Sequence, residues 1–441
     1  MLSHADNMKM CQVGRDTPMG TALRRFWTPI LASRQLPEPD CPPVRAEIFG
    51  EKLVAFRNTQ GEVGVLDEHC RHRNASLALG RVENCGIRCI FHGWLYAPNG
   101  EILETPNVSD DRFRTRFRAT SYPVREAGGF VWAYLGPAAL EPPFPHWRYF
   151  DYPETRRLTT TLVVQCNYVQ LLEALFDSSH LTILHQDAFK RDLNLSFAQN
   201  TVSVVTKADP RTEAEDTAFG FHYAALRAVQ TDEGLRTMAR IAAFVAPFHQ
   251  INPNGDLCGI VVPINDHTSL HHFVWWSDDK DICRGSEEGE KILAFTGLAD
   301  EILEERGLAY DTWHAAGHPN PRNNFLQDRV AMKQGSWSGL PNFFPEDAAV
   351  LVSSEPIRDR SKEMLAPVDV AIARLYRTYR KLLDTVARGE EPVGLMSDPR
   401  KIRGLQAIVP EGGTWKGLVP EHTACELQPA ERALGPADAA S

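Results

Sequence analysis

The 441 residues are enough for two or three domains with sizeable cores, and 43% of them are apolar, as in ordinary globular proteins. The net charge of −10, from 47 basic and 57 acidic side chains, argues against a nucleic acid partner, because nucleic acids are bound by basic surfaces. No apolar run approaches the roughly 18 residues that cross a bilayer, and the first ten residues lack the apolar stretch of a signal peptide. The nine cysteines, an odd number, then indicate thiols rather than disulfides. We therefore expect a cytoplasmic protein that binds neither nucleic acid nor membranes.

The N-terminal third changes from a helical to a strand-like pattern. A short helix is predicted over 17–27, with Pro18 at its first position. Short strands separated by turns are predicted at 44–49, 53–57, 63–66 and 130–135. Pro98-Asn99-Gly100 is typical of a hairpin turn. We expect an N-terminal helical segment over 1–40 that packs on the later, larger domain, and a small all-β domain over 41–147.

Two short motifs inside this β domain carry metal-binding residues. Cys70-x-His72 is followed, after 16 residues, by Cys89-x-x-His92. Two thiolates and two imidazoles paired in this way suit a Rieske-type [2Fe–2S] cluster, in which the two Cys hold one iron and the two His hold the other. The alternative is a Cys2His2 zinc site, but zinc fingers usually place Cys with Cys and His with His.

The residues around the motifs favour the cluster over zinc. Cys70-Arg71-His72-Arg73-Asn74-Ala75 and Cys89-Ile90-Phe91-His92-Gly93-Trp94 resemble the two ligand loops of Rieske domains, and spacing with matching flanks is stronger than spacing alone. Cys85 precedes the second loop, but each loop already supplies one Cys and one His, so Cys85 is interpreted as structural.

A Pro-rich stretch over 137–147 is interpreted as a linker to a second domain over 148–390. This domain mixes predicted strands with helices, and its strands are expected at 158–165, 241–245 and 270–276. Its last helix is predicted over 370–388, with Gly389 as the stop signal. Residues 391–441 are rich in Pro and Gly and are expected to form an irregular C-terminal extension.

His180 and His185 form a second candidate metal motif, His-x4-His. With one carboxylate they would make the two-His, one-carboxylate face of a non-haem Fe(II) oxygenase, which leaves coordination positions open. Residues five apart on a regular helix point about 140° from each other, so both rings reach one ion only if the helix is interrupted. We predict a break or bulge between them. The alternative is a pair of ordinary helix histidines.

Taken together, the chain resembles the oxygenase component of the Rieske non-haem iron aromatic-ring hydroxylases. The resemblance is to the phthalate-dioxygenase-like group, which includes chlorobenzoate dioxygenases and aromatic O-demethylases, and it extends from Val13 to about Arg380. The segments that carry it, besides the two ligand loops, are 20–27, 167–185, 221–227, 244–248 and 347–369. It implies an α+β fold: a small all-β Rieske domain and a larger catalytic domain whose antiparallel sheet is covered by helices.

The resemblance also implies roles for individual residues. Cys70, His72, Cys89 and His92 would hold the [2Fe–2S] cluster. His180 and His185 would bind the mononuclear Fe(II), with Asp347, which precedes the segment 354–361, as the third ligand. The rival carboxylates for that third position are Asp328, Glu346 and Glu355.

The resemblance also bears on three residues near His180: it suggests roles for Asp177 and Asn167, and Ala174 departs from it. Asp177 would be a bridging carboxylate, hydrogen-bonded to a cluster His of the neighbouring subunit and to an iron-binding His of its own; the alternative is a helix cap. Asn167 would either line the iron pocket or cap a helix. Ala174 stands where the family often has Gly, a departure with no expected effect on the chemistry.

The activity implied is that of a terminal oxygenase that uses O2 and hydroxylates an aromatic acid of the phthalate or benzoate type. The alternatives are O-demethylation of a methoxylated aromatic acid and, in another class, electron transfer without catalysis. Since the chain shows no Gly-x-Gly-x-x-Gly after a strand, electrons from NAD(P)H would come through a separate flavin and iron–sulfur reductase. A neighbour's cluster is needed, so the resemblance implies a homo-oligomer, a trimer or stacked trimers.

Two groups of arginines are candidates for binding. Arg227 and Arg240 lie in predicted pocket strands, where an arginine would bind an aromatic carboxylate with two parallel hydrogen bonds; the alternative is an exposed position on an alternating strand. Arginines near the cluster loops would dock the reductase, or would simply be solvated: Arg71, Arg73, Arg81 and Arg88.

Overall fold

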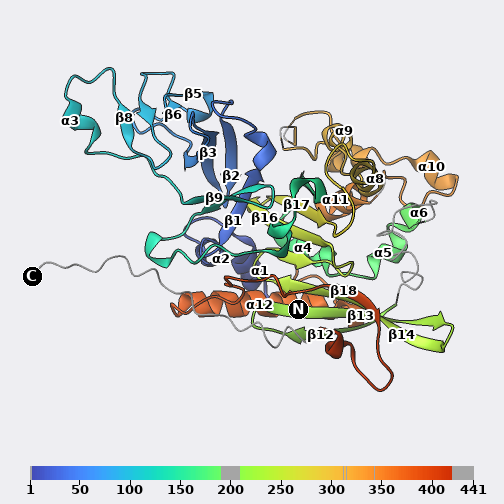
Figure 1. Cartoon of the computed structure of the whole chain (residues 1–441). Helices are drawn as coiled ribbons and strands as arrows, with labels where there is room; N and C mark the ends of the chain where they lie inside the picture. Colours follow the sequence, from blue (N-terminus) through green and yellow to red (C-terminus); the bar gives the residue numbers. More distant parts are fainter. Residues whose placement is uncertain (1, 190–208, 311, 314, 342, 420–441) are drawn as a thin grey trace, which may run out of the picture.

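The computed structural model describes residues 2–189, 209–310, 312–313, 315–341 and 343–419 (Figure 1). Two parts lie side by side: a small β domain, blue to cyan in Figure 1, and a larger domain in which helices cover a sheet. The predicted α+β fold class is confirmed. Within the described ranges, no helix has both the length and the apolar character needed to cross a bilayer.

The N-terminal segment contains α1 (His4–Cys11) and α2 (Pro18–Leu23). The Thr17 side chain caps α2 by accepting a hydrogen bond from the Gly20 N–H, and Pro18 takes the first helical position as predicted. The helix stops at Leu23, short of the predicted residue 27, because the fully buried run Trp27–Ala32 forms β1. β1 pairs antiparallel with β10 (Phe130–Tyr134), so part of the segment 1–40 belongs to a sheet of the β domain.

The β domain consists of short antiparallel strands. Its sheets have the orders β1-β10-β9, β2-β3-β4 and β5-β6-β7-β8. The strands not yet bounded are β2 (Val44–Ile48), β3 (Glu51–Arg57), β4 (Val63–Asp67), β5 (Arg81–Glu83), β6 (Gly86–Arg88), β7 (Leu95–Tyr96), β8 (Ile102–Glu104) and β9 (Val124–Ala127). Short helical pieces lie at η1 (Ser33–Gln35), η2 (Leu77–Leu79) and α3 (Asp111–Arg114). The predicted hairpin joins β7 and β8, and Gly100 there has a φ of 84°, which favours glycine.

A connection over 135–156 leads into the larger domain and contains η3 (Ala138–Leu140), η4 (Arg148–Asp151) and η5 (Glu154–Arg156). The large antiparallel sheet has the order β11-β17-β16-β15-β14-β13-β12. Its strands are β11 (Arg157–Val164), β12 (Arg211–Asp216), β13 (Gly220–Thr231), β14 (Gly234–Val245), β15 (His249–Ile251), β16 (Leu257–Asn265) and β17 (Thr268–Trp276).

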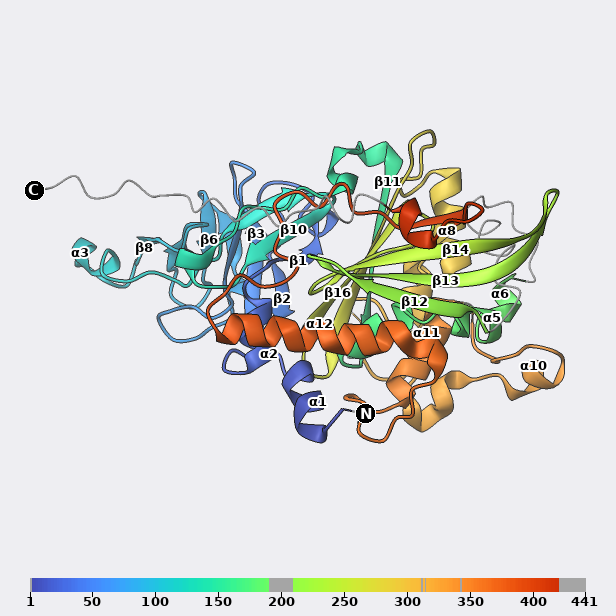
Figure 2. The same cartoon turned by 90° about the horizontal axis from the view of Figure 1, so that it is seen from below.

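The helices of this domain are short apart from one. They are α4 (Tyr168–Leu175), α5 (His180–Ile183), α6 (Gln186–Phe189), α8 (Glu287–Thr296), α9 (Asp300–Glu305), η6 (Pro321–Leu326), α10 (Arg329–Lys333), α11 (Phe344–Ser353), η7 (Pro367–Asp369) and α12 (Val370–Ala387). α12 runs along the sheet beside β12 (Figure 2), and Gly389 follows it with a φ of 73°, as the predicted stop signal requires.

The C-terminal extension is more ordered than its composition suggests. β18 (Leu405–Ile408) pairs with residues 238–241 of β14, and β15 pairs with residues 243–245 of the same strand. η8 (Trp415–Leu418) follows β18. Trp415 and Val419 form an apolar cluster with side chains of β13 and β14. The extension was expected to be irregular, but burying these apolar side chains fixes it on the sheet. Residues 420–441 lie outside the described part.

The alternation of side chains along the strands gives the large sheet two different faces. On one face, Phe244 of β14 contacts Phe176 and the α12 residue Tyr379, and α4 packs on β16 and β17. On the other face, His272 of β17 contacts Phe130 of β10. The first face lies under the helical layer, and the second packs against the β domain.

Candidate functional site

The helix that carries the two histidines is interrupted between them. α5 ends at Ile183, a turn occupies Leu184 and His185, and α6 starts at Gln186. The break predicted from the five-residue spacing is therefore present. It brings the rings of His180 and His185 to a centroid separation of 5.2 Å at 76°, which a regular helix would not allow.

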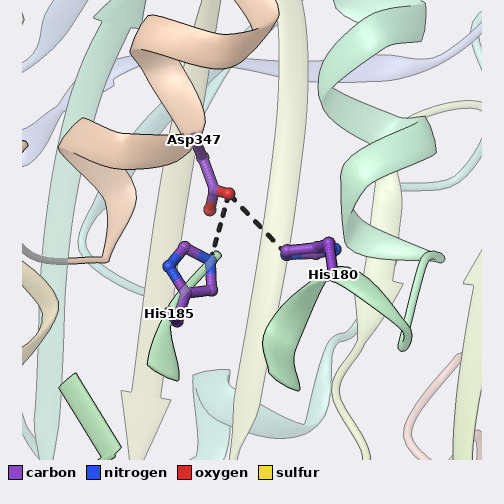
Figure 3. A group of neighbouring side chains, drawn as sticks. All are labelled: His180, His185 and Asp347. Atoms are coloured by element: carbon purple, nitrogen blue, oxygen red, sulfur yellow. Dashed lines mark ion pairs between the residues drawn. The ribbon is translucent and has the colours of Figure 1, made fainter. Parts of the chain in front are cut away.

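Asp347 of α11 joins the two histidines from far along the chain. Its Oδ1 lies 3.1 Å from His185 Nε2 and 3.7 Å from His180 Nε2 (Figure 3). One ligand atom from each of the three residues falls within 4.8 Å of the others. Two imidazole nitrogens and one carboxylate oxygen are the donor set of non-haem Fe(II) oxygenases, so the residues present fit such an ion.

The three rival carboxylates have other positions. Asp328 accepts hydrogen bonds from the N–H groups of Val330 and Ala331 and so caps α10. Glu355 follows α11 and is exposed. Glu346 is close, but it lies on the opposite side of the His185 ring from Asp347.

Glu346 orients the His185 ring through Nδ1, the nitrogen that points away from Asp347. Its Oε2 lies 2.8 Å from His185 Nδ1, and its Oε1 accepts a hydrogen bond from the Ser338 hydroxyl. The Phe343 ring stacks on His185 at 4.2 Å. A carboxylate on the far nitrogen fixes the tautomer and leaves Nε2 free to bind a metal. The sequence offered Glu346 only as a rival ligand, and its place next to Asp347 is the signal that separates the two roles, because adjacent helix residues point in different directions.

The electrostatics of this site suit a cation. Burial lowers the pKa of His185, but Asp347 and Glu346 more than offset this and raise it to about 9. Although Asp347 Oδ1 is 3.1 Å away, His185 Nε2 makes no well-aligned hydrogen bond within the described residues. Two carboxylates around a fully buried imidazole therefore favour a positive charge, which a proton or a metal ion supplies.

Asp177 lies between α4 and α5, close to His180. Its Oδ1 accepts hydrogen bonds from the N–H and hydroxyl of Ser179, and its Oδ2 lies 3.5 Å from His180 Nδ1. Burial raises the pKa of this carboxyl, but His180 and Ser179 lower it further, so the group stays ionised. One oxygen thus holds the local turn, while the other faces the histidine. The side chain keeps 28% of its surface exposed, so another molecule can reach it.

The four cluster residues come from two loops with the same backbone pattern. In the first loop Cys70 N–H donates to the Ala75 carbonyl and Asn74 N–H to the Cys70 carbonyl. In the second, Cys89 N–H donates to the Trp94 carbonyl and Gly93 N–H to the Cys89 carbonyl. The fifth residue of each loop has a positive φ, 56° at Asn74 and 76° at Gly93, which Asn and Gly tolerate best.

The side chains of these loops face each other. The rings of His72 and His92 are 4.4 Å apart, and Trp94 stacks on His72 at 4.8 Å. Cys70 and Cys89 are buried, whereas both histidines are partly exposed. The Tyr96 hydroxyl lies 3.0 Å from Cys70 Sγ. Paired thiols inside and paired imidazoles at the surface suit the two unlike irons of a Rieske cluster.

Cys85 and the loop arginines lie around this site. Cys85 accepts a hydrogen bond from Gln60. Arg88 pairs with Glu83 and Glu104, and Arg81 pairs with Glu83, so these two are held by acidic neighbours within their own sheet. Arg71 and Arg73 are exposed, and the Arg73 guanidinium lies 5.9 Å from the Phe91 ring centroid.

A cavity of about 1110 Å³, its open mouth included, lies between the helical layer and the sheet. His180, Asp347 and Asp177 are part of its lining. The remaining lining is largely apolar and aromatic, which suits a planar ring. This places the two-His, one-carboxylate group at the wall of a pocket large enough for a small aromatic molecule.

Arg240 of β14 lines this cavity and is buried. It donates to Gln406 Oε1 of β18 at 2.6 Å and to Asn254 Oδ1 at 3.4 Å, while its Nε has no hydrogen-bond partner among the described residues. Burial, and then the charge of Arg227, lower its pKa to about 10, so it remains a cation. No carboxylate in the described part pairs with this guanidinium.

The other two candidate pocket residues have structural contacts. Arg227 is buried beside the cavity and donates to the Ser178 carbonyl at 3.1 Å and to its hydroxyl at 3.2 Å, but it is not part of the lining. Asn167 caps α4 through the Val169 N–H and donates to the carbonyls of Cys11 and Asp266. Of the two roles predicted for Asn167, the structure shows the helix cap, because its amide is used by these backbone groups.

Sequence reasoning did not single out His271 and Trp275, which line the cavity from β17. Burial lowers the pKa of His271 to about 3, so the ring is uncharged. Both residues lie in the predicted strand 270–276, where alternation alone shows that they share one face. Which face meets the cavity depends on pairing with β16, and the sequence does not contain that information locally.

Two family models match the chain: a Rieske [2Fe-2S] domain over residues 26–123 and a LigXa C-terminal domain like region over 133–434. Among curated proteins, the phthalate 4,5-dioxygenase oxygenase subunit of Pseudomonas putida is 35% identical over 426 residues, covering 94% of each chain. The 3-chlorobenzoate-3,4-dioxygenase oxygenase subunit of Comamonas testosteroni is 34% identical, covering 88% of this chain and 91% of that one.

A third relative and a solved structure extend the comparison. The 5,5'-dehydrodivanillate O-demethylase oxygenase subunit of a Sphingobium species is 29% identical, covering 90% of this chain and 84% of that one. The crystal structure of dicamba monooxygenase bound to dicamba superposes with a TM-score of 0.55 at 18% identity, covering 83% and 99% of the two chains. At that identity the structural match supports the fold alone.

Proposed function

Because this chain belongs to the Rieske non-haem iron oxygenases, in the phthalate-dioxygenase-like group, we propose that it is the terminal oxygenase of a multicomponent system and that its substrate is an aromatic acid. The reaction proposed first is ring hydroxylation of a phthalate- or benzoate-like acid, by one or two oxygen atoms from O2. O-demethylation of a methoxylated aromatic acid is the second candidate, since one relative has that activity in its name.

The proposed metal ligands are those that the geometry brings together. Cys70, His72, Cys89 and His92 would hold the [2Fe–2S] cluster, and His180, His185 and Asp347 the mononuclear Fe(II). When bound, the cluster supplies electrons at a raised potential and the mononuclear iron supplies open coordination positions for O2. Glu346 holds the His185 ring in the orientation that this requires.

The chain's own residues would bind and orient the substrate. Arg240 supplies a buried cation on the cavity wall, and a carboxylate there would gain charged hydrogen bonds that the two amide partners do not satisfy. The apolar lining excludes water from the ring and holds it beside His180 and Asp347. The observation that carries the choice of an aromatic acid is that this buried arginine lines the same cavity as His180 and Asp347.

Assembly would bring the two metal sites together. In Figures 1 and 2 the sheet β5-β8 lies at the far end of the β domain from α5 and α6. We propose a homotrimer or stacked trimers, in which Asp177 of one copy meets a cluster histidine of its neighbour. The partly exposed Asp177 and the exposed Ile90 and Phe91 beside the cluster ligands support such a contact.

Electrons would come from NAD(P)H through a separate flavin and iron–sulfur reductase. Arg71 and Arg73 are exposed cations of the first cluster loop and are proposed to dock an acidic partner surface. The proposed setting is the cytoplasm, in the catabolism of aromatic compounds.

The test is a single turnover. Chemically reduced, fully loaded protein would meet O2 and a panel of benzoates, phthalates and methoxylated aromatic acids, with products read by mass spectrometry. Added oxygen on a carboxylated ring supports hydroxylation, and formaldehyde with a phenol supports O-demethylation. Iron analysis excludes or supports the electron-transfer alternative: about three iron atoms per chain for the oxygenase against about two for a carrier.

Arg240→Gln tests the anchor separately. Loss of charged hydrogen bonds of about 1.5–3 kcal/mol should raise KM for the carboxylated substrate about 10- to 100-fold. Arg236→Gln, on the same strand but paired with Glu233, is the matched control. An unchanged KM in the Arg240 variant would contradict the anchor.

A further inference from the structure

β17 places two of its side chains, His271 and Trp275, on the wall of the substrate cavity. Its register pairs Leu257 with Trp275, Gly259 with Phe273 and Val261 with His271, so these side chains share one face of the sheet. His271 and Trp275 line the cavity on that face. The intervening residues His272, Val274 and Trp276 lie on the opposite face, towards the β domain.

Each of the two lining residues carries a buried polar atom that the protein leaves unpaired. His271 Nε2 and Trp275 Nε1 have no hydrogen-bond partner among the described residues, and both side chains are only 2% exposed. On the opposite face, His272 Nδ1 lies 2.8 Å from the Thr161 hydroxyl. Its Nε2 also has no partner among the described residues, but that ring packs against Phe130 and is not part of the cavity lining. Buried polar groups are normally paired with protein or a bound molecule, so two unpaired atoms on one cavity wall indicate a missing partner.

The chemistry of this wall differs from that of Arg240. Leu257, which pairs with Trp275 in the sheet, is apolar, and Arg240 is the one arginine or lysine in the described lining of the cavity. Arg240 lies on β14, with β15 and β16 between it and β17. The cavity therefore has one cationic side and one uncharged side that can hydrogen-bond.

We propose that β17 forms a second recognition wall, where Trp275 and His271 bind an uncharged oxygen substituent of the aromatic acid whose carboxylate Arg240 holds. Indole N–H only donates, so the substituent must offer a lone pair. His271 Nε2 donates or accepts according to its tautomer, so a hydroxyl, an alkoxy oxygen or a carbonyl satisfies the wall. A second carboxylate does not suit it, because the described lining holds no arginine or lysine besides Arg240 to balance the charge. The inference rests on the proposed function and narrows its substrate class.

The experiment compares ligands of equal size. Dissociation constants for the fully loaded protein are measured by calorimetry for the three hydroxybenzoate isomers and the three matching methylbenzoates. For the isomer whose substituent reaches β17, hydroxybenzoate should bind about two- to tenfold more tightly than methylbenzoate, as expected for one or two net hydrogen bonds. This comparison needs no variant.

Variants of Trp275 and His271 then test whether these residues cause the preference for hydroxybenzoate over methylbenzoate. Trp275→Phe keeps an aromatic ring and removes the N–H, so the ratio of the two dissociation constants should fall towards one. Trp276→Phe, the neighbour on the opposite face, should leave that ratio as it is. His271→Leu should lower the ratio as well.

Two outcomes would overturn the proposal in different ways. If benzoates bind but no hydroxyl isomer is preferred, or the ratio survives both Trp275→Phe and His271→Leu, the second wall is refuted and the aromatic-acid assignment stands. If no benzoate binds the loaded protein, the proposed substrate class is refuted, and this inference with it.

Discussion

The two candidate metal regions are built from very different lengths of chain. The cluster residues all lie within residues 70–92, on two loops that repeat the same backbone hydrogen bonds. His180 and His185, by contrast, need a helix break and a carboxylate from α11, far along the sequence. The first region is defined by local geometry, and the second by how a sheet and two helical segments pack. A local motif can therefore be read from spacing, whereas a long-range one depends on the whole domain.

Removing one ligand from each region gives the largest expected effect. Asp347→Ala should reduce the iron content from about three to about two atoms per chain and leave the cluster spectrum intact, while product formation falls at least ~100-fold. Cys89→Ser should do the reverse, with loss of the cluster colour and retention of the mononuclear site. Iron analysis and visible spectra check both.

Asp328→Ala is the control for Asp347. It removes the cap of α10, at a cost of about 1 kcal/mol, without touching His180 or His185. If the Asp328 variant lost the mononuclear iron and the Asp347 variant kept it, the third ligand would be Asp328 and the assignment to Asp347 would be wrong.

Changing Glu346, which contacts His185 Nδ1, should have the next largest effect, on the affinity for Fe(II). Glu346→Gln weakens the partner of Nδ1, so affinity for Fe(II) should fall about 10- to 100-fold, as for other residues behind metal ligands. Titration of the metal-free protein with Fe(II) under anaerobic conditions measures it. Glu355→Gln, an exposed acid just beyond α11, should bind iron like the wild type. Equal affinities in both variants would mean that the site does not depend on Glu346.

A smaller effect is expected at the cluster. The Tyr96 hydroxyl lies 3.0 Å from the Cys70 sulfur and would donate to it when that sulfur is a thiolate ligand of the cluster. A hydrogen bond to a ligand sulfur stabilises the reduced cluster. Tyr96→Phe should lower the reduction potential by about 20–60 mV, the equivalent of one hydrogen bond for a one-electron couple. Redox titration followed by visible absorption measures this shift. Tyr134→Phe, whose hydroxyl donates to the Pro137 carbonyl, is the control and should leave the potential unchanged.

The smallest effect concerns the connection between the two parts. Glu51 of β3 pairs with Arg24 at 2.7 Å and with Arg15 at 2.6 Å, and accepts a hydrogen bond from Tyr122. Burial raises the pKa of Glu51, but these partners lower it below its usual value. The group therefore stabilises the fold above its unfolded pKa of about 4.3, and this stabilisation is lost as the pH falls through the lower folded pKa.

Glu51→Gln should accordingly destabilise the protein by about 1–3 kcal/mol at pH 7 and by less at acid pH. Thermal unfolding at several pH values measures the difference, with the exposed Glu38→Gln as control. A destabilisation that does not shrink towards acid pH would show that the charge of Glu51 is not what stabilises the junction.

The sequence predicted what short segments determine by themselves. Four strands of the β domain (β2, β3, β4 and β10), the helix start at Pro18 and the end of α12 before Gly389 follow from turn and capping residues, and the predicted bounds lie within two residues of the observed ones. The other strands of that domain were not predicted individually. The helix break followed from the angle between residues five apart. The prediction was wrong at Trp27, which was included in the helix over 17–27. Trp27 begins β1 instead, because that segment pairs with β10, and this contact is not visible in the local sequence.

Features that depend on distant contacts were left open or missed. Asp347 and Glu346 are neighbours in sequence, and only the packing of α11 against the His185 turn decides which faces Nε2. Arg227 and Arg240 looked equivalent, but only Arg240 lines the cavity. The order in residues 405–419 comes from an edge of β14 and an apolar cluster on the sheet, which composition does not reveal.

The central claim is that this chain inserts oxygen from O2 into an aromatic acid held by Arg240 beside His180, His185 and Asp347. The most direct measurement is a single turnover of the reduced, fully loaded protein under isotopically labelled O2, with mass spectrometry of the aromatic product. The account predicts a product that carries labelled oxygen for the wild type and none for Asp347→Ala with an intact cluster. Oxidation of the cluster with no labelled product from any aromatic acid, although both sites are loaded, would contradict it.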